Sequence, residues 1–144
     1  MFSLFKRKSD EVNDIYINII EQSRNPILYT DYNVPDKPIG RFQMLTLHAA
    51  PFFIDLINKG YSKTSQTLFD KIFSDIELSF REIGVGDLGV PKKMKRYMKD
   101  FNGIIHAHAA ANADHAEITR RNVFGDEGVM DGNFKLYIEG LFKP

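Results

Sequence analysis

The 144-residue sequence contains no cysteine. This absence excludes a disulfide framework, a thiolate zinc site, a cysteine-held iron–sulfur cluster and a cysteine nucleophile. The chain also lacks a surplus of charge, because 19 Lys and Arg residues balance 19 Asp and Glu residues. A neutral chain creates no overall field that draws it onto nucleic acid or lipid, so any such binding has to come from a local patch.

Long apolar runs are absent as well. Even the stretch from Phe52 to Ile57 is interrupted by Asp55, whereas a helix needs roughly 20 apolar residues to span a bilayer. Residues 1–8 form a separate tail in which the apolar positions 2, 4 and 5 precede the cations at positions 6 to 8, the reverse of a secretory signal. Two interpretations of this tail stay open: a solvated terminus, or a weak anchor at an anionic membrane surface.

What is present is the composition of a folded domain, with 43% hydrophobic residues, 12 phenylalanines and 26% charged residues. Two separate cores would each bury too little surface at this chain length, so we expect one domain over residues 9–144. Apolar residues recur at steps of three and four, and no stretch sustains a period of two. The sequence therefore predicts an all-α, single compact domain of about six to seven helices.

Capping and breaking residues set the expected helix ends. Helices are expected from Ser9 to the break at Asn25-Pro26, from Asp36 to Asn58, from Ser62 or Ser65 to Ile83, from Pro91 through His108, from Asp114 to about Phe124, and from Asp131 through Leu141. Residues 27–34 are expected to form an aromatic connector. Gly84 stands where a helix end favours positive φ, Pro91 stands where a helix tolerates proline as its first residue, and Asp114 opens a capping box with Glu117.

A literal G-x-G-x-x-G occurs from Gly84 to Gly89. That fingerprint binds a pyrophosphate because a strand delivers the loop to a helix N-terminus. Here the segment before it carries five apolar residues at helical spacing, from Phe69 to Ile83. We therefore interpret these glycines as a helix end and a tight passage into the next helix, and we expect no cofactor.

A histidine-rich segment invites a metal interpretation. Its candidate ligands are His106, His108, His115, Asp114 and Glu117. Residues two apart point to different sides of a helix, and neither H-E-x-x-H nor E-x-x-H occurs. His108 shares a face with apolar residues, so we expect a hydrogen-bonded core histidine. Because G-x-S-x-G, P-loop and kinase motifs are also missing, the sequence predicts no metal, no catalytic residue, no small-molecule substrate and no enzyme.

A basic cluster stands out against this background, with five cations within eight residues. Its members are Lys92, Lys93, Lys95, Arg96 and Lys99. Cations near the N-terminus of a helix oppose its macrodipole, so they favour a nearby acid or an anionic partner. A phosphate-bearing or acidic surface would meet that requirement. A solvated helix face is the alternative interpretation.

The predicted partner-binding surface extends from the end of one helix into this basic cluster. Its residues are Arg81, Glu82, Asp87, Lys92, Lys93, Lys95, Arg96 and Lys99. A secondary groove is expected beside Arg41 and His48, although His48 is also interpreted as a local hydrogen-bonding residue.

Several segments occur together in a consistent order between about Ile15 and Phe142. They are Gly40-Arg41-Phe42-Gln43-Met44-Leu45-Thr46-Leu47-His48, Leu68-Phe69-Asp70, Phe73-Ser74-Asp75, Arg81-Glu82-Ile83-Gly84-Val85-Gly86-Asp87-Leu88-Gly89-Val90 with Lys92-Lys93-Met94-Lys95, and Arg120-Arg121-Asn122-Val123-Phe124. In combination they resemble the ubiquinol–cytochrome c chaperone family, in its compact bacterial form. The run from Arg81 to Lys95 is the most specific part. The chain departs from the family pattern at Phe101-Asn102-Gly103-Ile104, where a tyrosine before the glycine and a basic residue after it are expected.

The resemblance implies an all-helical assembly factor for cytochrome b and the ubiquinol–cytochrome c reductase complex, complex III, acting through protein–protein binding. It implies nascent or newly inserted cytochrome b as the partner, with the ribosome or a small helical protein as further partners. The expected location is cytoplasmic, with peripheral contact at the inner face of the cytoplasmic membrane. The alternative, from another class, is a ribosome- or RNA-binding accessory module that uses the basic helix at residues 91–99.

Overall fold

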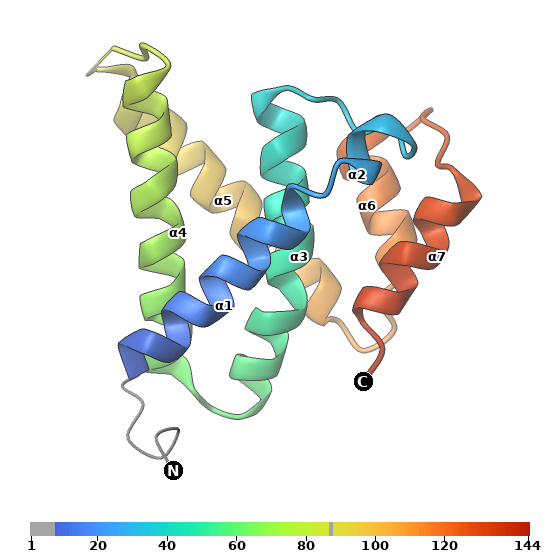
Figure 1. The fold of residues 1–144 in the computed structure, drawn as a ribbon. Helices are drawn as coiled ribbons and strands as arrows, with labels where there is room; N and C mark the ends of the chain where they lie inside the picture. The colour runs from blue at the N-terminus through green and yellow to red at the C-terminus, as the bar shows by residue number, and fades with distance from the viewer. Residues whose placement is uncertain (1–7, 87) are drawn as a thin grey trace.

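The computed structural model describes residues 8–86 and 88–144, and every regular element within them is a helix. The described helices are α1 (Lys8–Ser23), α2 (Ile27–Thr30), α3 (Pro38–Asn58), α4 (Ser62–Glu82), α5 (Gly89–Ala109), α6 (His115–Phe124) and α7 (Gly132–Leu141). The prediction of an all-α domain is confirmed (Figure 1). Among the described helices, none is long and apolar enough to cross a membrane.

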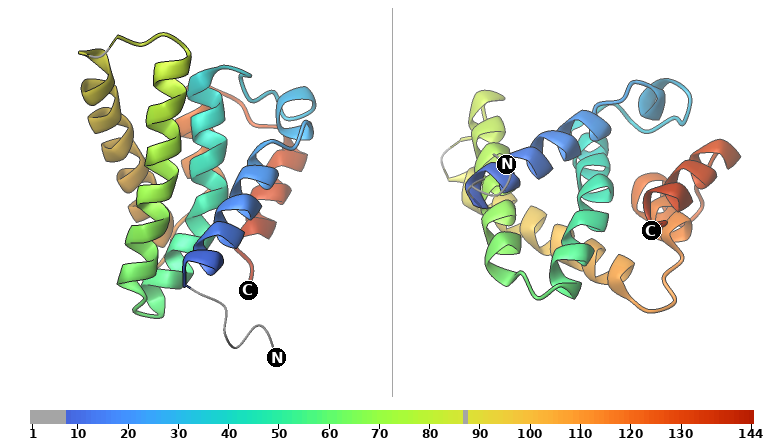
Figure 2. Two further views of the ribbon diagram at one scale, coloured as in Figure 1. Left: turned by 60° about the vertical axis from the view of Figure 1, so that its left-hand side comes forward. Right: turned by 60° about the horizontal axis from the view of Figure 1, so that its bottom comes forward.

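The long helices form one bundle and the short C-terminal helices pack at its side. α1 runs diagonally across α3 and α4, and α5 packs against the same two helices from another side (Figures 1 and 2). α6 and α7 pack on each other, and α6 also contacts α3 and α5. α3 and α5 therefore both connect the bundle to the C-terminal helices, and α3 contributes residues to both cores.

Phenylalanine rings fill the large core, which joins α1, α3, α4 and α5. Phe101 lies among them and is 1% exposed. Its ring meets those of Phe53 and Phe73 edge-on, with centroids 5.4 Å away in each case. Phe69 completes the contact at 5.8 Å. Edge-to-face pairs of this kind add to the stabilisation that comes from burying apolar area.

The small core lies between α3, α7 and the segment around α2. Its buried members are Leu28, Val34, Met44, Leu47, Phe134 and Ile138. Tyr32 stacks on Phe134 with centroids 4.9 Å apart, which holds the connector against α7. Phe142 packs against both cores, so the C-terminal end of the chain contacts each of them.

Several expected helix ends are confirmed. Gly84 has a φ of 88° and follows Ile83, the residue that caps the C-terminus of α4, as its position predicted. The Asp114 carboxylate accepts a hydrogen bond from the Glu117 amide at 3.1 Å, which caps α6. Asp131 caps α7 in the same way, by accepting from the amides of Asn133 and Phe134.

Other boundaries were predicted wrongly. α3 begins at Pro38 rather than at Asp36, and the connector contains the short helix α2. α5 begins at Gly89, so Pro91 is its third residue and not its first. The first four amides of a helix have no partner within that helix, so proline costs no hydrogen bond at either position. Glu117 does not complete the capping box in the expected manner, because its carboxylate pairs with Arg120.

Candidate partner-binding surface

α4 and α5 form a hairpin whose tip projects from the bundle (Figure 1). The last turn of α4 closes when the amide of Val85 donates to the Phe80 carbonyl at 3.0 Å. This closure needs Gly84 in the left-handed region, which residues with a β-carbon rarely adopt. The glycine therefore ends α4 and sends the chain towards α5.

Two large aliphatic side chains stand exposed at this tip. Ile83 is 64% exposed and Leu88 is 97% exposed. Single exposed apolar residues are common on protein surfaces, but these two lie nine and four residues before Lys92, the first cation of the basic cluster. Sequence reasoning treated Ile83 as the end of a buried seam, because helical spacing does not reveal where the neighbouring helix stops covering it.

The five cations cover the outer side of the first three turns of α5, and all five are exposed. The inner side of the helix carries the buried residues Val90, Met94, Tyr97, Phe101 and Ile105. Lys93 Nζ lies 5.9 Å from the centroid of Phe80, and Arg96 Cζ lies 6.0 Å from that of Tyr97. Both contacts suit a cation–π attraction, which holds the side-chain stems against the bundle.

None of these five cations forms an ion pair with a carboxylate in the part of the chain that the structure describes. Arg81, by contrast, donates to Glu77 at 3.2 Å, and Glu82 is exposed. Asp87, which belongs to the predicted surface, lies outside the described residues, as do residues 1–7 of the predicted tail. We call Ile83, Leu88, Lys92, Lys93, Lys95, Arg96 and Lys99 the hairpin surface.

Arg41 and His48, the two residues of the predicted secondary groove, are not both exposed. Arg41 lies on the surface and binds Asp36 at 2.8 Å, but His48 is 0% exposed. The Met44 carbonyl can only accept, so His48 carries its proton on Nδ1 and donates it over 2.7 Å. His48 Nε2 then accepts from the Tyr137 hydroxyl at 2.6 Å. Burial lowers the pKa of His48 to about 4. The interpretation of His48 as a local hydrogen-bonding residue is confirmed.

A second pair of histidines joins the end of α5 to the start of α6. His108 is buried, and its Nδ1 lies 2.9 Å from the Nδ1 of His115, so one ring donates and the other accepts. Phe142 stacks on His115 with centroids 3.7 Å apart. Burial, followed by the nearby His115, lowers the pKa of His108 to about 4. His106 points away to the surface, and no group of three potential metal ligands occurs among the described residues.

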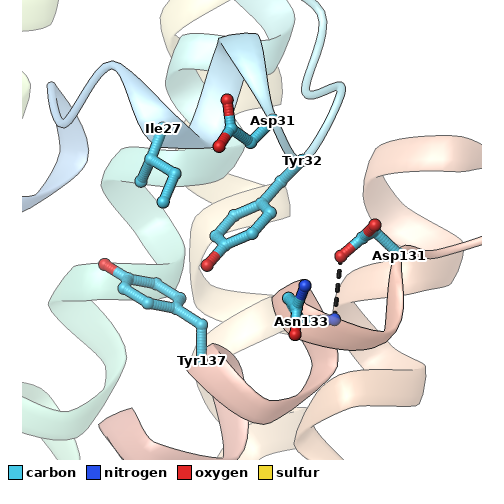
Figure 3. Close-up of a pocket in the computed structure, with 6 residues that line it drawn as sticks. All are labelled: Ile27, Asp31, Tyr32, Asp131, Asn133 and Tyr137. Atoms are coloured by element: carbon cyan, nitrogen blue, oxygen red, sulfur yellow. Dashed lines mark hydrogen bonds between the residues drawn. The ribbon is translucent and has the colours of Figure 1, made fainter.

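A polar pocket of about 650 Å³ opens between the α2 segment and the start of α7. The rings of Tyr32 and Tyr137 lie on one side of it and Asp131 on the other (Figure 3). Its two carboxylates are already engaged, because Asp131 caps α7 and Asp31 accepts from the Thr30 hydroxyl at 2.9 Å. This arrangement serves the structure of α2 and α7.

The sequence profile described as ubiquinol-cytochrome C chaperone matches residues 30–135. The chain belongs to the ubiquinol–cytochrome c chaperone family. It is also similar to the crystal structure of the Cbp3 homolog from Brucella abortus, with 31% sequence identity and a TM-score of 0.72. That alignment covers 99% of this chain and 88% of the Brucella chain. A comparison with curated proteins finds no match.

Two residues within the segments that resemble the chaperone family have structural roles that sequence reasoning missed. A β-carbon on Gly40 would lie 1.9 Å from the Pro35 carbonyl oxygen, so only glycine lets α3 start this close to the connector. Arg120 Nη1 donates to the carbonyls of Gly125, Asp126 and Gly128, at 3.1, 3.2 and 2.7 Å. Arg120 thereby ties the loop between α6 and α7 to α6. Neither role has a signal in helical spacing.

Proposed function

We propose that this ubiquinol–cytochrome c chaperone binds newly made cytochrome b and delivers it to complex III assembly, and that the hairpin surface faces this partner. The observation that carries the proposal is the set of five exposed cations without a carboxylate partner in the described chain. It is supported by the similarity to the Cbp3 homolog over 99% of the chain.

The cations are poorly explained by the fold alone. All of them lie in the first three turns of α5, and Lys92 is in the first turn, where the positive end of the helix dipole disfavours a cation. The buried residues on the other side of α5 already hold the helix in place. An acidic segment of a partner would neutralise the cluster and gain charge-assisted hydrogen bonds.

The test replaces Lys92, Lys93 and Arg96 together with glutamine in cells from which the natural gene has been deleted. The deletion itself should lower the complex III content, and the triple variant should fail to restore it. Cytochrome b should also no longer co-purify with the variant. Folding should be almost unchanged, because exposed substitutions usually stay within about 0.5 kcal/mol each.

A matched control removes three positive charges elsewhere on the surface, through Lys63→Gln, Lys135→Gln and Lys143→Gln. All three lysines are exposed and lie outside the hairpin surface. This control should restore complex III as well as the parent protein does. If the Lys92, Lys93 and Arg96 variant also restores it, the hairpin surface is only a solvated helix face.

The same cations also suit an RNA- or ribosome-binding module. Binding to phosphates releases counterions, so the affinity for RNA would then fall steeply as the salt concentration rises. A filter-binding series with ribosomal RNA between low and physiological salt measures this slope. Tight, salt-dependent RNA binding without co-purification of cytochrome b would favour the module over the chaperone.

A further inference from the structure

We propose that the tip of the α4–α5 hairpin docks on an anionic lipid bilayer, with Leu88 and Ile83 entering the headgroup region and the cations of α5 contacting lipid phosphates. This membrane proposal rests on the proposed function only because both use the hairpin surface. It adds that the protein binds the membrane at the place where it contacts cytochrome b.

The first reason is the order of side chains along α5. Leu88, Lys92, Lys95 and Lys99 follow one another at steps of four, three and four residues, which places them on one face of the helix. Leu88 is at the tip and is 97% exposed, and the lysines follow over about 16 Å of helix. An apolar side chain followed by cations on the same helix face suits the boundary between acyl chains and phosphate headgroups, because the apolar side chain can enter the boundary and the cations can contact the phosphates.

The second reason is the position of the tip relative to the rest of the fold. The C-terminus of α4 and the N-terminus of α5 lie at the same end of the bundle (Figure 1). Ile83 directly follows α4 and Leu88 directly precedes α5, and both side chains are exposed. One bilayer surface can therefore contact both residues. The long stems of lysine and arginine allow the charged groups to reach headgroups on either side of the tip.

Lipid explains the exposed side chains better than RNA does. Proteins that bind single-stranded RNA stack bases on exposed aromatic rings. At this surface the aromatic residues Phe80 and Tyr97 are buried beneath the cations, and the exposed apolar residues are aliphatic. The surface therefore offers phosphate contacts together with insertion, and no platform for bases.

The kind of cation at this surface also suits lipid headgroups, because four of the five cations are lysines. Flexible lysine side chains suit a fluid array of headgroups, because no fixed geometry is required. Each one contributes to binding through attraction to the negative surface potential of the membrane.

The absence of tryptophan from the chain allows a direct test. Leu88→Trp places a single fluorescent reporter at the tip, and Val129→Trp places one at a control position that is 87% exposed and distant in sequence. With vesicles that contain 30% phosphatidylserine in phosphatidylcholine, we expect a blue shift and quenching by brominated lipids for the Leu88 reporter alone. Pure phosphatidylcholine vesicles should give neither change.

Vesicle sedimentation then measures the contributions of charge and insertion. Lys92→Gln with Lys95→Gln and Lys99→Gln should lower the partition coefficient on the anionic vesicles by about 100-fold. Leu88→Ser should lower it by about tenfold, and Val129→Ser should leave it unchanged. A loss of binding on changing positions 2, 4 and 5 to serine, with none on Leu88→Ser, would place the anchor in the N-terminal tail and overturn the proposal.

Two further outcomes would also overturn it. One is an unshifted Leu88 reporter on anionic vesicles, and the other is a reporter that responds to ribosomal RNA but not to vesicles. The purified protein is sufficient for these measurements, so they are independent of cytochrome b. If lipid binding fails while the Lys92, Lys93 and Arg96 variant still loses complex III, the chaperone proposal stands alone. If lipid binding holds while complex III is normal, the membrane proposal stands alone.

Discussion

The two cores of the molecule are held together by different kinds of contact. In the large core, phenylalanine rings from α3, α4 and α5 meet edge-on around Phe101. At the edge of the small core, a buried histidine bonds a tyrosine that is 89 residues away in the sequence. The large core therefore depends on apolar burial, which is insensitive to pH. The small core depends in addition on one ring nitrogen staying unprotonated.

This difference also separates structural residues from candidate functional ones. His48 and His108 suggested chemistry as sequence features, yet both are buried and hydrogen-bonded inside the fold. No carboxylate in the described chain pairs with the exposed cations of α5, and only Lys93 and Arg96 lie against aromatic rings. A buried polar group with satisfied bonds is explained by the fold, whereas an exposed cluster of like charges without a counter-charge is not.

The largest expected effect comes from breaking the large core with Phe101→Ala. Removing a fully buried ring that contacts three others should lower the free energy of unfolding by about 3–5 kcal/mol. Urea denaturation followed by circular dichroism measures the loss. Phe101→Leu retains most of the buried volume and should cost distinctly less. If Phe101→Ala lowers the free energy of unfolding no more than a surface substitution does, the ring contacts of Phe101 do not stabilise the large core.

The next effect is acid destabilisation through His48. Its pKa is about 4 in the fold and about 6.5 when unfolded, so the unfolded state binds more protons between these values. Stability is therefore fully present above pH 6.5 and is lost as pH falls towards 4, by about 3 kcal/mol for this residue. His108 shifts in the same direction. Denaturation of the wild type and of His48→Gln at several pH values isolates the contribution of His48 to the loss of stability in acid. If the free energy of unfolding falls equally steeply with pH in both proteins, His48 does not cause the loss.

Removing the Tyr137 hydroxyl, which donates a hydrogen bond to His48, should lower the stability by a smaller amount. Tyr137→Phe leaves the buried Nε2 without its 2.6 Å partner, at an expected cost of about 1–2 kcal/mol. Tyr32→Phe is the matched control, because its ring lies in the same pocket and its hydroxyl has no partner among the described residues (Figure 3). Thermal melting should show a lower Tm for the first variant and an almost unchanged Tm for the second.

The smallest effect is expected at the hairpin tip, outside both cores. Gly84→Ala forces a β-carbon into a φ of 88° and should cost about 1 kcal/mol, although no atom lies near enough to clash. Gly86, two residues later, has no positive φ, so Gly86→Ala should stay within about 0.5 kcal/mol. Equal costs at the two positions would mean that backbone strain does not end α4.

The basic part of the proposed surface could be predicted from residue types alone, but its apolar residues could not. The charge run in α5 is visible in the sequence, and each of its five members proves to be exposed. Leu88 was not singled out, because its exposure depends on the loop that ends α4. The prediction of a groove beside Arg41 and His48 was wrong. The two residues lie on the same helix, but Arg41 is exposed and His48 is buried.

Local physics by itself determined the helical class, most helix ends and the basic cluster. Helical spacing, the caps at Asp114 and Asp131 and the left-handed glycine at Gly84 act within a few residues of the chain. Only the tertiary structure decided which residues lie inside and which lie at the tip. The contact between His48 and Tyr137 and the exposure of Leu88 depend on how helices far apart in the sequence pack together, and spacing along one helix carries no information about that packing.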